Sequence, residues 1–320
     1  MQFDPGLKTL PQVSLERVSS GMPSIEELQR ARRVLGSVWH VRFDDIKYID
    51  VTERFGLVTV AAGVRDVAVC GFATKNNVAQ LGQLKEILDR HGLLSHMTRQ
   101  VSPLPHERSE GVIGELAEVF DRVDTESYSR GTGRLLWVFS DPNRRDDIDR
   151  AVAREIQVGL LLGYPPCCVK REAILQNSRQ RAFAAAIISA VGRDANAVER
   201  ALREDLEVAI PADSAIDPNM LNTREHFPFV FHTACDGCLS SDQSRSVELN
   251  RSYEALATEV DRGFHRLFLD IAKLEVAEGR IFAEADKQGL RSGELEQHSN
   301  QRLQEIFRER DRLYARLFEP

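Results

Sequence analysis

The segment Gly163-Tyr164-Pro165-Pro166-Cys167-Cys168 places two neighbouring cysteines directly after a glycine and two prolines. The residues that follow, Val169 to Leu175, are helical in character, so these cysteines are expected in the first turn of a helix. A second pair stands in Cys235-Asp236-Gly237-Cys238, just ahead of Ser240-Ser241-Asp242, which can cap another helix. The two pairs contain four of the five cysteines of the chain, and they define the central part of the predicted fold.

A strand and a helix are predicted immediately before the first cysteine pair. Arg134 to Ser140 is an apolar run typical of a buried strand. Asp141-Pro142 then supplies the N-cap and the first-turn proline of a helix that continues to Leu162. Gly163 is expected to end this helix. Residues 133–246 are therefore assigned to a cysteine-rich metal-site domain.

Residues 21–100 are expected to form a small α/β unit that follows an extension at residues 1–20. Ser24-Ile25-Glu26-Glu27 is a capping box that opens a helix through Val34, stopping at Gly36. Asn77 to His91 has the apolar spacing of an amphipathic helix. The segments predicted as strands are Trp39 to Phe43, Ile46 to Val51, Leu57 to Ala61 and Asp66 to Phe72. Residues 101–132 carry no clear chemical signature and are treated as a connector.

The last part of the chain, residues 247–320, is almost free of proline and rich in Leu, Ala, Glu and Arg. Its single predicted break is at Gln288 to Gly293, which indicates a helical hairpin that packs on the metal-site domain. Such a hairpin could bind a protein partner or form a homodimer. The chain as a whole is predicted to be α+β and predominantly helical.

Bulk composition is that of an ordinary globular protein, with 42% hydrophobic residues in 320. The formal charge of -7 argues against a dedicated nucleic-acid surface, since phosphates are bound by basic patches. The start of the chain lacks the pattern of a secretory signal, and the apolar runs are too short to cross a bilayer. A cytoplasmic location is therefore predicted, where paired cysteines are expected to bind metal or take part in redox chemistry.

Four thiolates together select zinc or an iron-sulfur cluster over harder ions. The leading interpretation is an iron-sulfur cluster of the 4Fe-4S type, held by Cys167, Cys168, Cys235 and Cys238 between two helix N-termini that stabilise negative charge. The alternatives are a zinc-stapled structural or interaction module, a metal-free dithiol oxidoreductase, and four thiols that are simply buried in the core. The fifth cysteine, Cys70, is assigned to a buried strand.

Two histidines, His226 and His232, lie just upstream of Cys235. Each could bind the metal, orient a ligand, act as an acid or base, or have a purely structural role. If the protein is an enzyme of redox or sulfur-transfer chemistry, the catalytic candidates are Cys168, His226 and His232. The basic residues that could hold a small anionic substrate are Lys170, Arg171, Arg224 and Arg245. Solvated ion pairs are the more common role for such side chains.

The run from Leu161 to Val169, together with the later Cys235-x-x-Cys238, resembles an uncharacterised family of mostly archaeal and bacterial proteins. That family carries a Gly-Tyr-Pro-x-Cys-Cys-Val motif. The resemblance covers roughly residues 150–255 and implies that the thiols form one site, but it supplies no reaction. A looser similarity is to the cysteine-rich domains of heterodisulfide-reductase type, which hold iron-sulfur clusters. The chain differs from them in its longer interval between the pairs and in having Val169 where they have glycine.

Overall fold

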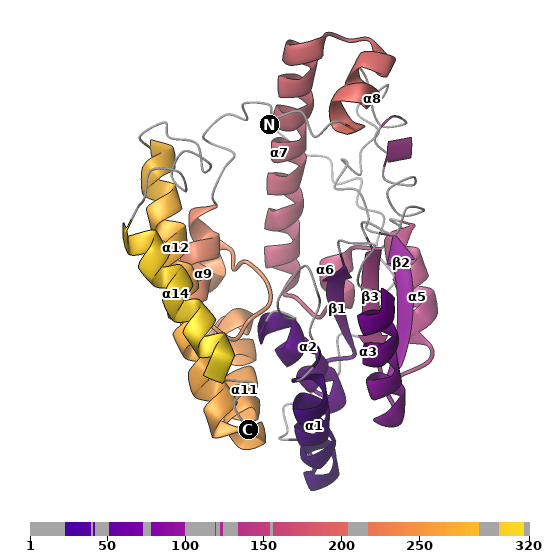
Figure 1. Cartoon of the computed structure of the whole chain (residues 1–320), viewed down its shortest axis with the longest axis vertical. Coiled ribbons are helices and arrows are strands. Elements are labelled where there is room, and N and C mark those ends of the chain that lie inside the picture. Colours follow the sequence, from indigo (N-terminus) through magenta and orange to yellow (C-terminus); the bar gives the residue numbers. More distant parts are fainter. Residues whose placement is uncertain are drawn as a thin grey trace.

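The structure is a computed structural model, and it describes residues 23–39, 41, 51–72, 78–99, 119, 122–123, 134–153, 156–203, 217–287 and 301–316. Within these residues helices predominate, and the strands form a single three-stranded sheet (Figure 1). The prediction of a predominantly helical α+β fold is therefore confirmed.

The sheet consists of β1 (Val67–Phe72), β2 (Leu94–Arg99) and β3 (Arg134–Phe139), in the order β1-β3-β2. Both pairings are antiparallel, and Phe139 lies opposite Val67 on one side and Leu94 on the other. The predicted strands at β1 and β3 are confirmed, whereas β2 was not predicted. Since β3 is the central strand, residues of the α/β unit and of the metal-site domain share this sheet.

The first helix, α1 (Ile25–Val38), begins with the predicted capping box. The Glu27 N–H donates to the Ser24 hydroxyl at 3.2 Å, and the Ser24 N–H donates to the Glu27 carboxylate at 2.7 Å. The predicted end of this helix was wrong, because α1 continues through Gly36.

The next helix, α2 (Val51–Ala61), replaces the strand predicted at Leu57 to Ala61, so that prediction was wrong. Every residue from Phe55 to Ala61 is buried, and a helix buried on all sides lacks amphipathic periodicity. The predicted strand at Ile46 to Val51 lies outside the described residues except for Val51, which begins the helix. Most of the one at Trp39 to Phe43 also lies outside them.

The amphipathic helix predicted at Asn77 to His91 is confirmed as α3 (Val78–Arg90). The single helix predicted from Asp141 to Leu162 was wrong, since the structure has α5 (Arg144–Val152) and α6 (Val158–Leu161) instead. The chain turns at Gln157, which has an extended backbone and precedes α6. Ile156, at the break, is buried with Trp137 and Phe139 in a small core on one face of the sheet.

The longest helix to carry a cysteine is α7 (Pro166–Val191), which extends away from the sheet (Figure 1). Gly192, with a φ of 82°, ends it, and α8 (Ala195–Arg203) packs against its far end. Pro165 and Pro166 open α7, as the sequence predicted.

The last part of the chain contains α9 (Pro218–His226), α10 (Asp236–Leu239), α11 (Arg245–Val260), α12 (Arg262–Lys287) and α14 (Gln301–Arg316). The prediction of a hairpin with a single break, at Gln288 to Gly293, was wrong, because the chain also breaks at Asp261. There the Asp261 carboxylate accepts the Phe264 N–H at 2.6 Å. Arg32 of α1 donates to the carbonyls of Val260 at 3.2 Å and Glu259 at 2.5 Å. The predicted break itself lies outside the described residues.

The main core is formed by α1, α2, α3, one face of the sheet, α11 and α12. Phe55 lies at its centre, and its ring is within 6.2 Å of five other aromatic rings: Phe229, Phe231, Tyr253, Phe264 and Phe268. Cys168 and Cys238 belong to the same buried cluster. The cysteine site is therefore built on the main core. In the described part of the chain, none of the helices has the length and apolar character needed to cross a bilayer.

Candidate metal centre

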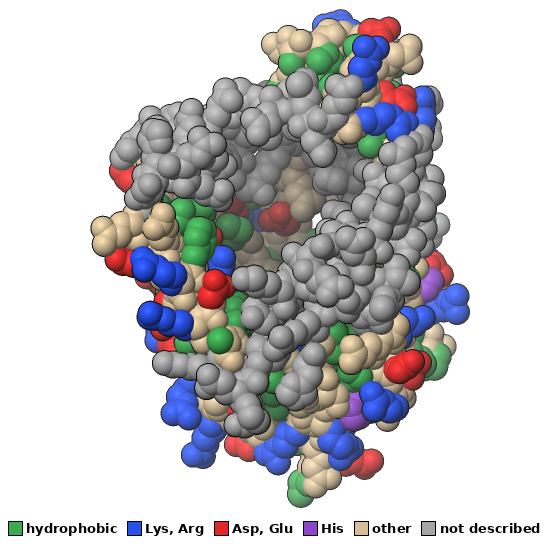
Figure 2. Space-filling view, viewed as in Figure 1, with side chains coloured by type: hydrophobic (Ala, Val, Ile, Leu, Met, Phe, Trp, Pro, Cys, Tyr) green, Lys and Arg blue, Asp and Glu red, His purple; other side chains and the backbone are tan. Residues whose placement is uncertain are grey.

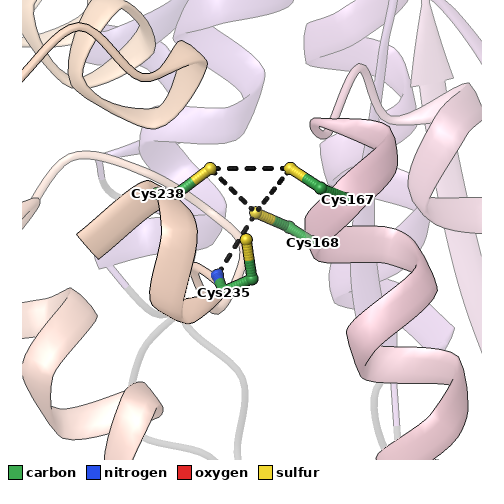
Figure 3. A group of neighbouring side chains, drawn as sticks. All are labelled: Cys167, Cys168, Cys235 and Cys238. Atoms are coloured by element: carbon green, nitrogen blue, oxygen red, sulfur yellow. Dashed lines mark hydrogen bonds between the residues drawn. The ribbon is translucent and has the colours of Figure 1, made fainter. Parts of the chain in front are cut away.

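The structure brings the four predicted cysteines together, although the two pairs are far apart in the sequence (Figure 3). All four Sγ atoms lie within 4.8 Å of one another. The Sγ of Cys238 is 3.6 Å from that of Cys167 and 3.6 Å from that of Cys168, and the Cys167 and Cys168 sulfurs are 4.0 Å apart. These residues therefore form a compact group that could hold a metal ion.

The first pair is positioned by the start of α7. The N–H groups of Cys168 and Val169 donate to the Pro165 carbonyl at 2.9 and 3.0 Å, which closes the first turn. Helix α6 approaches this turn closely at Gly159, where a Cβ atom would lie 2.7 Å from the Val169 side chain. Gly159 therefore lets α6 support the cysteine-bearing turn. The placement predicted from the two prolines is correct.

The second pair lies on a separate turn. Cys235 is the N-cap of α10, and its carbonyl accepts the N–H groups of Cys238 and Leu239, both at 2.9 Å. The next helix, α11, is capped by Ser244 and not by Ser240 to Asp242, so that detail of the prediction was wrong. The Ser244 hydroxyl also donates to the Cys238 carbonyl at 2.9 Å, which fixes the turn to the helix.

The four sulfurs differ in exposure and in hydrogen bonding. Cys168 and Cys238 are buried, Cys235 is half-buried and Cys167 is exposed. The Cys235 N–H donates to the Cys168 Sγ at 3.4 Å, and the Ser246 hydroxyl lies 3.9 Å from the same sulfur. Three of the ligands thus face protein, and one faces solvent.

Burial also separates the acidities of the thiols. It raises the pKa of Cys167 and, more strongly, the pKa of Cys168. Burial opposes ionisation of Cys238 too, but hydrogen bonds from Ser246 and the neighbouring thiols bring the pKa of Cys238 below its usual value. In the absence of a cation, thiols with a raised pKa retain their protons at neutral pH. A metal ion would displace those protons, because a coordinating thiol is deprotonated.

His232 reaches the cysteines through Ser246, whose Oγ lies 2.9 Å from its Nε2. Burial and the nearby charge of Arg65 lower the pKa of His232 to about 4, so it is neutral at neutral pH. Its ring packs on Tyr164 with centroids 5.1 Å apart. His226, by contrast, is an exposed residue at the end of α9 whose Nδ1 bonds to the Asn222 carbonyl at 2.8 Å. The group of mutually close ligand atoms consists of the four cysteines, with neither histidine in it.

A polar network ties together the elements that carry the cysteines. Arg171 of α7 donates two hydrogen bonds to Asp217, at 2.6 and 2.7 Å, and Asp217 caps α9. Asn219 of α9 donates to the carboxylate of Asp236, next to Cys235, at 2.6 Å and to the Ala234 carbonyl at 3.3 Å. Sequence reasoning missed this network, although Asp217-Pro218 is a recognisable helix-start signal.

The basic residues considered for substrate binding are mostly engaged within the protein. Arg171 pairs with Asp217, Arg224 with Glu275 at 2.6 Å, and Arg245 with Glu248 at 2.8 Å. Lys170 is exposed. The alternative considered from the sequence, that these basic side chains form ion pairs, is therefore correct for the three arginines. Binding of a small anionic substrate stays a prediction.

A buried cation that the sequence did not indicate, Arg65, lies near His232. The Arg65 side chain donates to the Leu162 carbonyl at 3.1 Å, and its guanidinium lies over the rings of Phe231 and Tyr164, 4.4 and 5.7 Å from their centroids. Its positive charge contributes to the lowered pKa of His232. Cys70 lies in β1 and is buried, as predicted.

Comparison with known proteins identifies no relative, since no family model, curated protein or solved structure matches the chain. The chemistry of the site must therefore be inferred from its geometry.

Proposed function

We propose that Cys167, Cys168, Cys235 and Cys238 bind one zinc ion, which holds the start of α7 against α10 and the main core. The separation of the sulfurs carries this proposal. A zinc–sulfur bond of about 2.3 Å in a tetrahedron places the ligand sulfurs about 3.8 Å apart. Three of the sulfur pairs here lie 3.6, 3.6 and 4.0 Å apart, and all pairs lie within 4.8 Å. The residues present thus fit a single tetrahedral ion.

An iron-sulfur cluster, the leading interpretation from the sequence, is the second candidate. In a 4Fe-4S cluster each cysteine binds a different iron, and the irons and sulfides lie between the ligands, so the sulfurs stand farther apart than around one ion. Two of the sulfurs belong to buried residues of the main core, which resists such a spread. The exposed Cys167 is the observation that favours a cluster, because one edge of the site can open toward solvent.

The proposed zinc is structural and supports a helical module. The ion would link segments that are distant in sequence, and the surrounding hydrogen bonds from Ser246 and the Cys235 N–H would offset the excess negative charge of four thiolates. On the face seen in Figure 2, Lys and Arg side chains are interspersed with Asp and Glu. This mixture of charges argues against a nucleic-acid partner, which would be bound through a basic patch.

We also propose that the family with the Gly-Tyr-Pro-x-Cys-Cys-Val motif shares this site. In residues 163–169 each element of the motif has a place: Gly163 has a φ of 76°, Tyr164 packs on His232, and the cysteines lie in the first turn of α7. The described cysteines are all free thiols, which suits the reducing conditions of the cytoplasm.

Metal analysis of anaerobically purified protein tests the proposal. We expect a colourless protein with one zinc per chain, and cobalt substitution should give the absorption of a tetrahedral thiolate site. Replacing Cys235 and Cys238 by serine should abolish binding, whereas Cys70→Ala, which adds no polar group to the core, should retain it. A brown protein with iron and acid-labile sulfide would establish the cluster instead. A metal-free protein with a titratable dithiol couple would point to the oxidoreductase alternative.

A further inference from the structure

Cys167 differs from the other three cysteines in its surroundings. It is exposed, whereas Cys168 and Cys238 are 2% and 5% exposed and Cys235 is half-buried. An oxidant or alkylating reagent in solvent therefore reaches the Cys167 sulfur first. Access is one of the two factors that determine the reactivity of a thiolate, and nucleophilicity is the other.

Hydrogen bonding also favours Cys167 as the more reactive sulfur. Cys168 accepts the Cys235 N–H at 3.4 Å and lies 3.9 Å from the Ser246 hydroxyl. Such bonds withdraw electron density from a metal-bound sulfur and weaken it as a nucleophile. Among the described residues, the polar contacts of the Cys167 sulfur are with other sulfurs. Of the two sulfurs on α7, that of Cys167 therefore keeps more of its electron density than that of Cys168.

The Cys238 sulfur lies close enough to react with an oxidised Cys167. The two Sγ atoms are 3.6 Å apart, and a disulfide requires about 2.05 Å. Cys168 is the poorer partner, because its sulfur is 4.0 Å away and a disulfide between adjacent residues is strained. A bond from Cys167 to Cys238 would connect α7 to α10.

We propose that Cys167 is the reactive thiolate of this centre, and that its oxidation by a peroxide forms a disulfide with Cys238 and releases the metal ion. The inference rests on the proposed zinc site. In the first step the Cys167 thiolate attacks one peroxide oxygen, the O–O bond breaks, and a sulfenic acid and hydroxide form when the oxidant is hydrogen peroxide. In the second step the Cys238 thiolate attacks the sulfenic sulfur and expels a second hydroxide. Each peroxide thus takes up two electrons from two thiolates.

Release of the ion follows from the loss of ligands. After the disulfide forms, Cys168 and Cys235 are the thiolates that remain of the group, and a closed structural site requires four ligands. The disulfide preserves a link between α7 and α10 while the ion leaves. A dithiol reductant would regenerate both thiolates and restore binding.

The test uses the full-length, zinc-loaded protein. Limited treatment with iodoacetamide followed by peptide mass spectrometry should place the first label on Cys167. Anaerobic titration with hydrogen peroxide should release one zinc per peroxide, detected with a metallochromic dye, and peptide mapping should find a bond between Cys167 and Cys238. Dithiothreitol with added zinc should reverse the change. Cys70→Ala, which removes a thiol outside the site and keeps all four proposed ligands, should behave as the wild type.

The outcomes separate the two proposals. Untreated protein without zinc refutes the metal site itself. Zinc-containing protein that is labelled first on another cysteine, or that forms a Cys235–Cys238 disulfide, overturns this inference and leaves the metal site standing. The labelling result uses no variant, so it decides the matter on the wild-type protein.

Discussion

Ser246 is the residue through which the metal centre contacts the protein beyond its ligands. It is fully buried at the start of α11, 2.9 Å from the His232 Nε2 and 3.9 Å from the Cys168 Sγ. The lowered pKa of His232 keeps its ring neutral. If Nε2 carries the proton, it donates to the Ser246 oxygen, and the hydroxyl hydrogen then points at sulfur. Ser246 is thus suited to orient and stabilise one thiolate ligand.

Replacing Ser246 by alanine should weaken metal binding by about 10-fold to 100-fold, the usual cost of removing a partner that orients a ligand. The variant keeps all four thiols, so stoichiometry should remain one ion per chain. Competition against a chelator of known affinity measures the change. Ser178→Ala, at an exposed position farther along α7, is the matched control and should bind as the wild type. Unchanged affinity in Ser246→Ala would show that the hydroxyl is a packing group.

Metal affinity should depend steeply on pH. The raised pKa values of Cys167 and Cys168 mean that both thiols are protonated at neutral pH without the ion, so binding must displace at least two protons. Affinity should therefore fall as pH falls, by about 100-fold per pH unit for two protons. Chelator competition at several pH values around neutrality measures this slope. A flat profile would mean that the thiols are already ionised in the metal-free protein.

At this scale the sequence predicted which cysteines lie together but not what surrounds them. Two pairs of cysteines can be recognised from the sequence alone, because cysteine is rare and the members of each pair lie close together in the chain. Arg65, Asp217 and Ser246 are common residue types at unremarkable positions, and their roles depend on contacts between segments far apart in the chain. Spacing along the sequence carries no signal for such contacts.

Individual elements were predicted best where one face is exposed. The helix α3 has one apolar face and one polar face, and its prediction was correct. In α2 the run Leu57-Val58-Thr59-Val60 is wholly buried and has three β-branched residues, so local propensity favoured a strand while packing produced a helix. The break between α11 and α12 combines a local cap, in which the Asp261 carboxylate accepts the Phe264 N–H, with bonds from Arg32 of a distant helix to the last carbonyls of α11. Tertiary contacts thus decided the first case and contribute to the second.

Helix α7 should depend on its ion pair with Asp217 for its attachment to α9. The Asp217 side chain is 5% exposed and that of Arg171 is 21% exposed. Arg171→Met would leave a buried carboxylate without its cation, and we expect a loss of about 3 kcal/mol in the free energy of unfolding. Urea unfolding of the metal-loaded protein measures it. Lys170→Met removes the neighbouring exposed charge and should change the free energy of unfolding little. Equal effects of the two substitutions would contradict the proposed role of the ion pair between Arg171 and Asp217.

The whole molecule combines a sheet with a compact group of four cysteines, and the stabilities of the two regions should be separable. β3 lies between two strands that precede it by many residues, and its two faces contribute to different buried clusters. The strand order was not predictable, because β2 (Leu-Ser-His-Met-Thr-Arg) is as long as the other two strands but contains a single β-branched residue, Thr98, and no aromatic residue besides His96. The cysteines contact the main core at one edge, so the sheet has hydrophobic support that does not require the ion.

Removing the metal should therefore loosen one region before the rest. We expect a chelator to lower the thermal midpoint, because a ligand present at about 1,000 times its Kd stabilises the folded state by about 4 kcal/mol. Hydrogen exchange monitored by mass spectrometry should accelerate first in the opening turn of α7 and in α10, while amides of β1 and β3 remain protected. Uniform acceleration across all of these elements would show instead that the ion supports the entire fold.

The length of α7 means that a small rotation at the cysteine cluster would move the far end of the helix by a larger distance. With 26 residues the helix is about 39 Å long at ~1.5 Å per residue, and its base is the turn that contains Cys167 and Cys168. Since α8 sits at the opposite end (Figure 1), a tilt of about 5° at the base would carry that end through roughly 3 Å. A change of a few tenths of an ångström among the sulfurs is thereby converted into a displacement large enough for another molecule to detect.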